Sequence, residues 1–161
     1  MIDFDTHPWL SGLLGDEDIG EVFSPKAELR RYLRIEAAWT LALGEIQGDS
    51  GAKRLAKSIE DFELEPSSLR SGFAKDGVPI PSLVRFLKAH LGKGADRLVH
   101  DGLTSQDVLD TGLMLALLEV LDVLEVRLQR LDSQLSSLQE ALGSASLIAY
   151  TRMQPALETS V

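Results

Sequence analysis

The longest regular pattern in the sequence is a leucine repeat that ends at Leu142. Its eight leucines are spaced alternately four and three residues apart, as in a helix that packs along a seam against other helices. They are Leu117, Leu121, Leu124, Leu128, Leu131, Leu135, Leu138 and Leu142. Residues 104–142 contain no proline, and Gly143 is a natural stop. The pattern therefore predicts one helix over most of residues 104–142.

A helix of that length cannot be buried by one compact chain. At 1.5 Å per residue it would be roughly 58 Å long, whereas a globule of this chain length would be about 40 Å across. The leucine seam must therefore pack against further helices. A coiled-coil dimer and a bundle built from several subunits explain the pattern equally well.

The first hundred residues predict several shorter helices. One begins at Pro25, with Ser24 as its N-cap, and ends near Gln47, because the glycine-rich segment that follows stops it. Its apolar positions form a wide stripe, and we expect Arg31, like the two arginines nearby, to lie largely off that stripe. The class predicted from these patterns is all-α.

Further helices are expected over residues 52–59, 66–74 and 81–91, with a possible short helix over residues 95–99. We find no convincing alternation of apolar and polar residues with period two, so no strand is predicted.

Charge and composition narrow the function classes. The net charge of −9 argues against broad binding to nucleic acid or to anionic membranes, because both would repel the chain. The chain has no cysteine, its first residues are acidic, and no uncharged apolar run approaches the roughly 18 residues of a membrane helix. We therefore expect a cytoplasmic protein without a membrane partner, whose anionic ligands are held by local positive groups.

Candidate chemistry gathers at the start of the predicted long helix. Thr104 and Asp107 have the spacing of a capping box, in which each side chain bonds the other residue's backbone N–H. The same helix start can bind an anion through its free N–H groups and its dipole. The two interpretations are compatible if Thr104 caps the helix and Ser105 faces a ligand. His100, four residues before Thr104, can donate to a carboxylate or transfer a proton there.

Other candidate residues lie outside this segment. Lys75, beside a glycine turn, is either a solvated charge or a cation for an anionic substrate. Arg152 stands between Thr151 and Gln154, and its guanidinium can hold a carboxylate through two parallel hydrogen bonds. We find no metal-ligand cluster, no glycine-rich phosphate loop and no nucleophile elbow, so neither a metal nor another cofactor is predicted.

Two sequence blocks resemble a known family. Residues 100–111, His-Asp-Gly-Leu-Thr-Ser-Gln-Asp-Val-Leu-Asp-Thr, resemble the first conserved block of the fumarase/aspartase superfamily. Residues 150–156, Tyr-Thr-Arg-Met-Gln-Pro-Ala, resemble its second block, where fumarases and adenylosuccinate lyases usually have Thr-His-x-Gln-Pro. Arg152 takes the histidine position, which favours the cycloisomerase branch. Residues 7–13, 23–25 and 74–78 are also similar to that branch.

The resemblance implies an architecture. It implies an N-terminal helical domain over residues 1–102, then the first long helix and the start of the second helix of a central bundle over residues 103–161. It implies a homotetramer in which blocks from three subunits meet at each active site. The third block, a mobile Gly-Ser-Ser-x-Met-Pro-x-Lys loop with the catalytic serine, does not occur in the chain. We therefore expect a truncated part of a longer enzyme, inactive by itself.

The implied reaction is the lactonisation of 3-carboxy-cis,cis-muconate in protocatechuate degradation, with no cofactor, because the substrate supplies both nucleophile and acceptor. The resemblance implies catalytic roles for His100, Ser105 and Arg152, and substrate binding by Thr104, Ser105, Thr151, Arg152, Gln154 and Lys75. Two alternatives remain: a lyase of the same superfamily that releases fumarate, similar to adenylosuccinate lyase, and a non-catalytic helical oligomerisation module.

Overall fold

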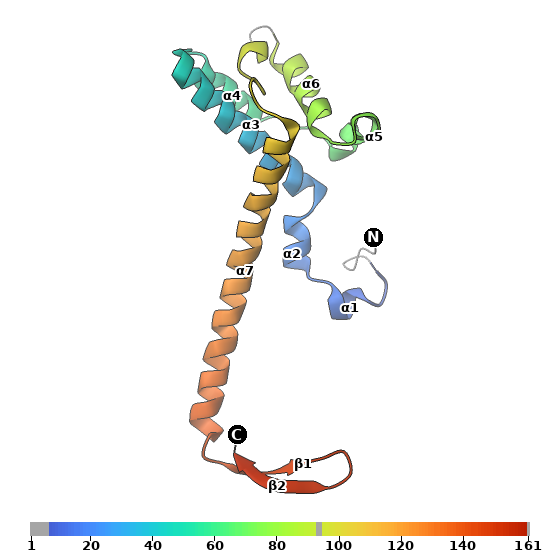
Figure 1. Ribbon diagram of the computed structural model, residues 1–161, viewed down its shortest axis with the longest axis vertical. Helices are drawn as coiled ribbons and strands as arrows, with labels where there is room; N and C mark the ends of the chain where they lie inside the picture. Colours follow the sequence, from blue (N-terminus) through green and yellow to red (C-terminus); the bar gives the residue numbers. More distant parts are fainter. Residues whose placement is uncertain (1–6, 93–94, 161) are drawn as a thin grey trace. The chain divides into compact units, whose positions relative to one another are not determined.

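The computed structural model describes residues 7–92 and 95–160. Its elements, in chain order, are α1 (Ser11–Leu14), α2 (Glu17–Val22), α3 (Pro25–Gln47), α4 (Ala52–Glu60), η1 (Pro66–Leu69), α5 (Arg70–Asp76), α6 (Ile80–Leu91), η2 (Ala95–Arg97), α7 (Ser105–Leu142), β1 (Ser146–Tyr150) and β2 (Pro155–Ser160) (Figure 1). Helices dominate the described part, so the all-α class is confirmed. The single helix predicted from the leucine repeat is confirmed as α7.

Local signals set the two ends of α3. The Ser24 Oγ accepts the N–H of Ala27 at 3.2 Å, and Pro25 occupies the first turn, where its missing N–H costs nothing. The helix stops at Gly48, whose φ of 68° lies in the left-handed region. The predicted bounds of this helix are confirmed.

The hydrophobic core of the first compact unit, Met1–Val120, lies among α3, α4, α6 and the first turns of α7. Two glycines allow the helices to approach closely. A Cβ on Gly44 would lie 2.0 Å from the Cβ of Ala52, and a Cβ on Gly112 would lie 2.9 Å from Cε1 of Tyr32. Gly44 therefore permits the contact between α3 and α4. Gly112 permits the contact that holds the start of α7 against α3.

The prediction that Arg31 lies off the buried stripe is wrong. Arg31 is 4% exposed. Its guanidinium donates to the backbone oxygen of Val22 at 2.5 Å and to Glu119 Oε2 at 3.3 Å. A buried cation is tolerated when it is paired in this way, and its partners come from the end of α2 and from α7. The spacing of apolar residues within α3 could not predict these partners, because both lie outside α3.

The second compact unit, Leu121–Val161, contains the rest of α7 and the antiparallel hairpin of β1 and β2. The expected start of a second helix is wrong for the described residues, because Pro155–Ser160 form β2. A short helix without packing partners is unfavourable, whereas pairing with β1 supplies backbone hydrogen bonds locally. The predicted boundary near residue 102, between an N-terminal helical domain and a central bundle, stays a prediction.

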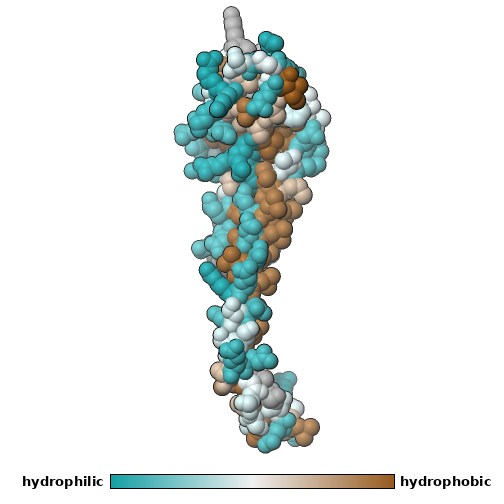
Figure 2. Space-filling view, turned by 90° about the vertical axis from the view of Figure 1, so that its left-hand side faces the viewer, coloured by the Kyte–Doolittle hydropathy of each residue, from teal (hydrophilic) through white to brown (hydrophobic). Residues whose placement is uncertain are grey.

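The leucine seam of α7 is open in the single chain. Its eight leucines are between 38% and 63% exposed, and Figure 2 shows hydrophobic side chains gathered along one side of this helix. Exposed apolar surface of this extent is typical of surfaces that bind a partner. Within the described residues, no helix combines the length and the apolar character needed to cross a membrane.

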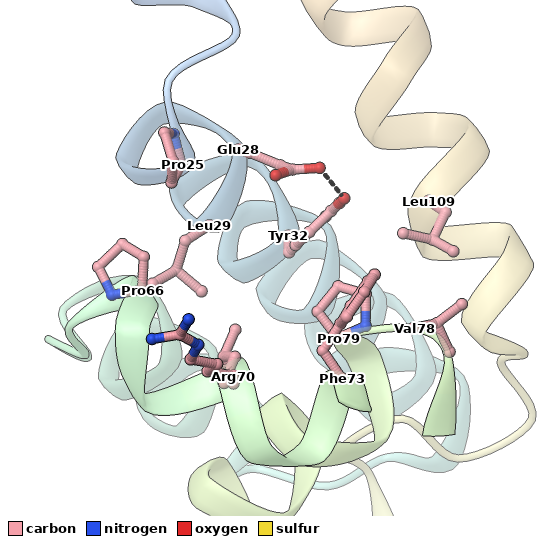
Figure 3. A pocket seen from close by; sticks show the side chains of 11 residues that line it. Pro25, Glu28, Leu29, Tyr32, Pro66, Arg70, Phe73, Val78, Pro79 and Leu109 are labelled. Atoms are coloured by element: carbon pink, nitrogen blue, oxygen red, sulfur yellow. Dashed lines mark hydrogen bonds between the residues drawn. The ribbon is translucent and has the colours of Figure 1, made fainter. Parts of the chain in front are cut away.

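An apolar groove of about 390 Å³ lies where α3 faces η1 and α5 (Figure 3). Tyr32 and Phe73 line it, and the Tyr32 hydroxyl donates to Glu28 Oε1 at 2.5 Å. Burial raises the pKa of Tyr32, and the adjacent Glu28 carboxylate raises it further. None of the predicted site residues lines this groove.

Candidate active site at the start of the long helix

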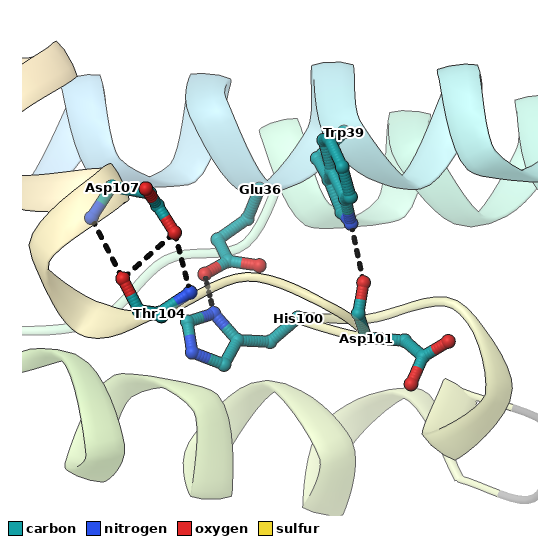
Figure 4. Close-up of polar contacts among 6 residues, drawn as sticks. All are labelled: Glu36, Trp39, His100, Asp101, Thr104 and Asp107. Atoms are coloured by element: carbon teal, nitrogen blue, oxygen red, sulfur yellow. Dashed lines mark hydrogen bonds and ion pairs between the residues drawn. The ribbon is translucent and has the colours of Figure 1, made fainter.

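Thr104 and Asp107 form the capping box that the sequence predicts (Figure 4). The Thr104 Oγ1 accepts the backbone N–H of Asp107 at 3.2 Å, and Asp107 Oδ2 accepts the backbone N–H of Thr104 at 2.7 Å. The Thr104 hydroxyl also donates to Asp107 Oδ2 at 2.7 Å. These bonds from the Thr104 backbone and hydroxyl lower the pKa of Asp107. Thr104 is therefore committed to the helix cap.

Ser105 is the first residue of α7 and is half-buried. In the described part of the chain, no hydrogen bond occupies its hydroxyl. The first turn of a helix also has backbone N–H groups without intrahelical partners and carries the positive end of the helix dipole. This helix start can therefore offer hydroxyl and backbone donors to a carboxylate, as the sequence predicts.

His100 is fixed by a partner from α3. Its Nδ1 lies 2.6 Å from Oε1 of Glu36, and the two residues are 64 positions apart in the sequence. One helical turn further along α3, the indole N–H of Trp39 donates to the backbone oxygen of Asp101 at 2.7 Å. Helix α3 thus holds the loop before α7 at two successive points (Figure 4).

Sequence reasoning missed Glu36. This carboxylate is 0% exposed and follows the buried Leu33 by three positions and the buried Leu29 by seven, on the same face of α3. A charged residue inside an apolar stripe is seldom buried without a partner. That violation of the helical pattern was the available signal. The pattern could not name His100 as the partner, because their contact is tertiary.

Burial raises the pKa of Glu36 above the ordinary carboxyl range. The ring of His100, its backbone N–H and the ammonium group of Lys88 act in the opposite direction, because each favours the charged carboxylate. Among the described residues, Glu36 Oε2 has no hydrogen-bond partner. The carboxylate therefore makes its hydrogen-bonded contact on one side only, toward His100.

A groove of about 850 Å³ runs beside the helix start, between α3 and α7. It is lined by apolar side chains such as Ile35 and Leu115, with Trp39 and Asp107 next to the cap. None of the predicted site residues lines this groove. Lys75 is exposed in the last turn of α5, and no hydrogen bond or ion pair joins it to another described residue. Its place in the site stays a prediction.

The second predicted block forms the loop of the hairpin. The Thr151 N–H and hydroxyl donate to the backbone oxygen of Gln154 at 2.9 and 3.0 Å, and the Gln154 N–H donates back to the Thr151 hydroxyl at 3.2 Å. Arg152 is exposed inside this closed loop. Thr151, Arg152 and Gln154 therefore lie together. They belong to the second compact unit, whereas His100, Thr104, Ser105 and Lys75 belong to the first.

The arrangement suits anion binding and proton transfer. The helix start offers the Ser105 hydroxyl and backbone N–H donors next to the Asp107 carboxylate of the cap, and the imidazole of His100, in the preceding loop, is a group that can transfer a proton. Among the described residues, no three histidine, aspartate or glutamate side chains gather as a metal site.

No family model matches the chain. The chain is 32% identical over 143 residues to a 3-carboxy-cis,cis-muconate cycloisomerase from Pseudomonas putida, an alignment that covers 84% of this chain and 33% of the relative. The structure of this chain is similar to that of the 3-carboxy-cis,cis-muconate lactonizing enzyme from Pseudomonas putida, with a TM-score of 0.76 and 28% sequence identity. The match covers 96% of this chain and 36% of that enzyme. The chain belongs to the fumarase/aspartase superfamily.

Members of the superfamily with other activities are also similar. An adenylosuccinate lyase from Archaeoglobus fulgidus is 27% identical over 148 residues, covering 91% of this chain and 32% of that enzyme. The chain thus spans about a third of the length of the curated relatives it matches.

Proposed function

We propose that this chain supplies two carboxylate-binding walls of a 3-carboxy-cis,cis-muconate cycloisomerase. The observation that carries the proposal is the start of α7, where Thr104 closes the cap and the hydroxyl of Ser105 is left without a hydrogen bond among the described residues, five positions after His100. The curated relatives named for this activity, at 32% to 35% identity, support the same choice.

The proposed reaction adds one substrate carboxylate across a double bond, and a proton is delivered to the adjacent carbon. The substrate contains both the nucleophile and the acceptor, so the step requires no change of oxidation state. Ser105, the backbone N–H groups of the first turn and the helix dipole hold one carboxylate, Thr104 supports them by closing the cap, and His100 is a polar or proton-transfer contact. Such preorganised donors stabilise the negative charge that develops on the enolate-like intermediate.

The second wall is assigned to the hairpin loop. Arg152 grips another carboxylate through two parallel hydrogen bonds, with Thr151 and Gln154 as its neighbours. Lys75 is a further cation for the same tricarboxylate. Because the two blocks meet across subunits in the superfamily, we propose that the site is completed in a homotetramer, with the exposed leucine seam of α7 as the association surface. Light scattering tests this assembly, and a stable monomer at micromolar concentration contradicts it.

The alternative activity is elimination of fumarate, as in an adenylosuccinate lyase. Arg152 argues against it, because that branch of the superfamily usually has a histidine at the equivalent position. A purely structural oligomerisation module is the second alternative. The polar groups near the start of α7 argue against that alternative, because a coiled coil needs neither a partly buried histidine–carboxylate pair before the helix nor the capping box.

A chimera tests the proposal. This chain replaces the matching segment of the Pseudomonas putida cycloisomerase, and the purified chimera is assayed with 3-carboxy-cis,cis-muconate and with adenylosuccinate. We expect the chimera to form the lactone and to release no fumarate, whereas the 161-residue chain alone is inactive. A tetrameric chimera that releases fumarate and forms no lactone overturns the assignment.

A further inference from the structure

The loop before α7 holds His100 in an unusual backbone conformation. Its φ of 59° is the only positive φ among the described non-glycine residues. Such a conformation persists only where the surrounding structure enforces it, and it often marks a functional position. Here α3 enforces it from both sides of the peptide, since Glu36 contacts the ring and Trp39 binds the carbonyl of Asp101.

The contact with Glu36 has features of a charge-assisted bond. The 2.6 Å separation is shorter than an ordinary N–H···O bond, as expected when the acceptor is ionised. The carboxylate is fully buried, and among the described residues the ionisable groups that act on it are the His100 ring and Lys88 from α6. Burial has the largest influence on Glu36 and raises its pKa, whereas both groups and the backbone N–H of His100 lower it. These contacts therefore favour a carboxylate that accepts over a carboxyl that donates, as the short Nδ1···Oε1 separation also does.

We propose that Glu36 is a positioning residue for His100, whose Nδ1–H it accepts, so that the ring is held as the tautomer with an unprotonated Nε2. The role of His100 in the reaction rests on the proposed function, but the tautomer does not. In Figure 4 the second ring nitrogen points away from Glu36. The bare Nε2 atom is then the ring position that accepts a hydrogen bond or a proton from a ligand or from solvent.

Nitrogen-15 NMR of the 161-residue chain labelled at histidine tests the tautomer directly, because protonated and unprotonated ring nitrogens have well-separated shifts. The chain has three histidines, and a His100→Gln variant assigns the signal. At a pH where the ring is neutral, we expect one tautomer, with Nδ1 protonated and Nε2 bare. A proton on Nε2, or a mixture of the two tautomers, overturns the proposal.

Glu36→Leu removes the hydrogen-bond acceptor and places an apolar side chain of similar size in the buried stripe. We expect this variant to lose the single tautomer. The matched control is Glu45→Leu, the same change at an exposed position of α3, which leaves the tautomer unchanged. An unchanged tautomer in Glu36→Leu overturns the proposal. If circular dichroism shows that Glu36→Leu fails to fold, the NMR spectrum of the unmodified chain still tests the tautomer of His100.

The chimera adds the functional readout. Glu36→Leu should lower kcat roughly 10- to 100-fold with little change in KM. The kcat of the double variant Glu36→Leu/His100→Gln should be no lower than that of His100→Gln alone, because Glu36 acts through His100. Additive losses contradict a positioning role. If the unmodified chimera lacks cycloisomerase activity, the proposed function fails while the NMR result still decides the tautomer.

Discussion

Replacing Thr104 and Ser105 separately by alanine distinguishes a role in capping α7 from a role in binding the ligand. In Thr104→Ala, α7 loses both bonds of the hydroxyl and keeps only the bond from the backbone N–H of residue 104 to Asp107. The usual cost of losing such an N-cap is about 1 kcal/mol. In Ser105→Ala no intramolecular hydrogen bond is lost, and alanine is the better helix former by a few tenths of a kcal/mol. The two variants should therefore differ in stability by roughly 1 kcal/mol or slightly more.

Urea unfolding followed by circular dichroism measures this difference at one fixed protein concentration, since association contributes to apparent stability. A loss of about 1 kcal/mol should lower Tm by roughly 2–4 °C in a chain of this size. In the chimera, Ser105→Ala should reduce kcat/KM while leaving Tm unchanged, and Thr104→Ala should reduce both. If Ser105→Ala lowers the stability as much as Thr104→Ala and keeps full activity, the block is a helix cap and the site assignment is wrong.

Three further predictions concern packing, substrate binding and pH. Gly44→Ala should destabilise the chain by about 1–2 kcal/mol despite the better helix propensity of alanine, because its Cβ would lie 2.0 Å from that of Ala52. In urea unfolding, adding Ala52→Gly to this variant should restore part of the lost stability. In the chimera, Arg152→Lys should lower kcat/KM roughly tenfold or more, because an ammonium group cannot make two parallel bonds, and steady-state kinetics would contradict this if the two enzymes were equal. Burial raises the pKa of Glu36, so the folded state keeps the carboxyl proton to higher pH than the unfolded state does. The free energy of unfolding should therefore fall as pH rises from the ordinary carboxyl range through the raised pKa. Urea unfolding of Glu36→Gln across that range should not show this pH-dependent fall.

The elements that sequence patterns predict well are those with local causes. The leucine spacing determines α7, and Ser24, Pro25 and Gly48 determine both ends of α3. The capping box at Thr104 is equally local, since both partners lie within one helical turn. Such features can be recognised without knowing the fold.

The features that the sequence did not predict depend on contacts between distant segments. The pairing of Glu36 with His100 joins positions 64 residues apart, and the burial of Arg31 depends on Glu119, 88 residues away. The hairpin was missed for a different reason. Its strands are short and show no clear alternation, and a helix after Gln154 would need packing partners that a hairpin does not.

A crystal structure of the chimera with the bound lactone is the most direct test of the central claim, that the start of α7 binds a substrate carboxylate. We predict one carboxylate of the lactone within hydrogen-bond distance of Ser105 Oγ and of a backbone N–H in the first turn of α7, with His100 Nε2 facing the ligand. An active chimera whose lactone lies away from this helix start would contradict the account.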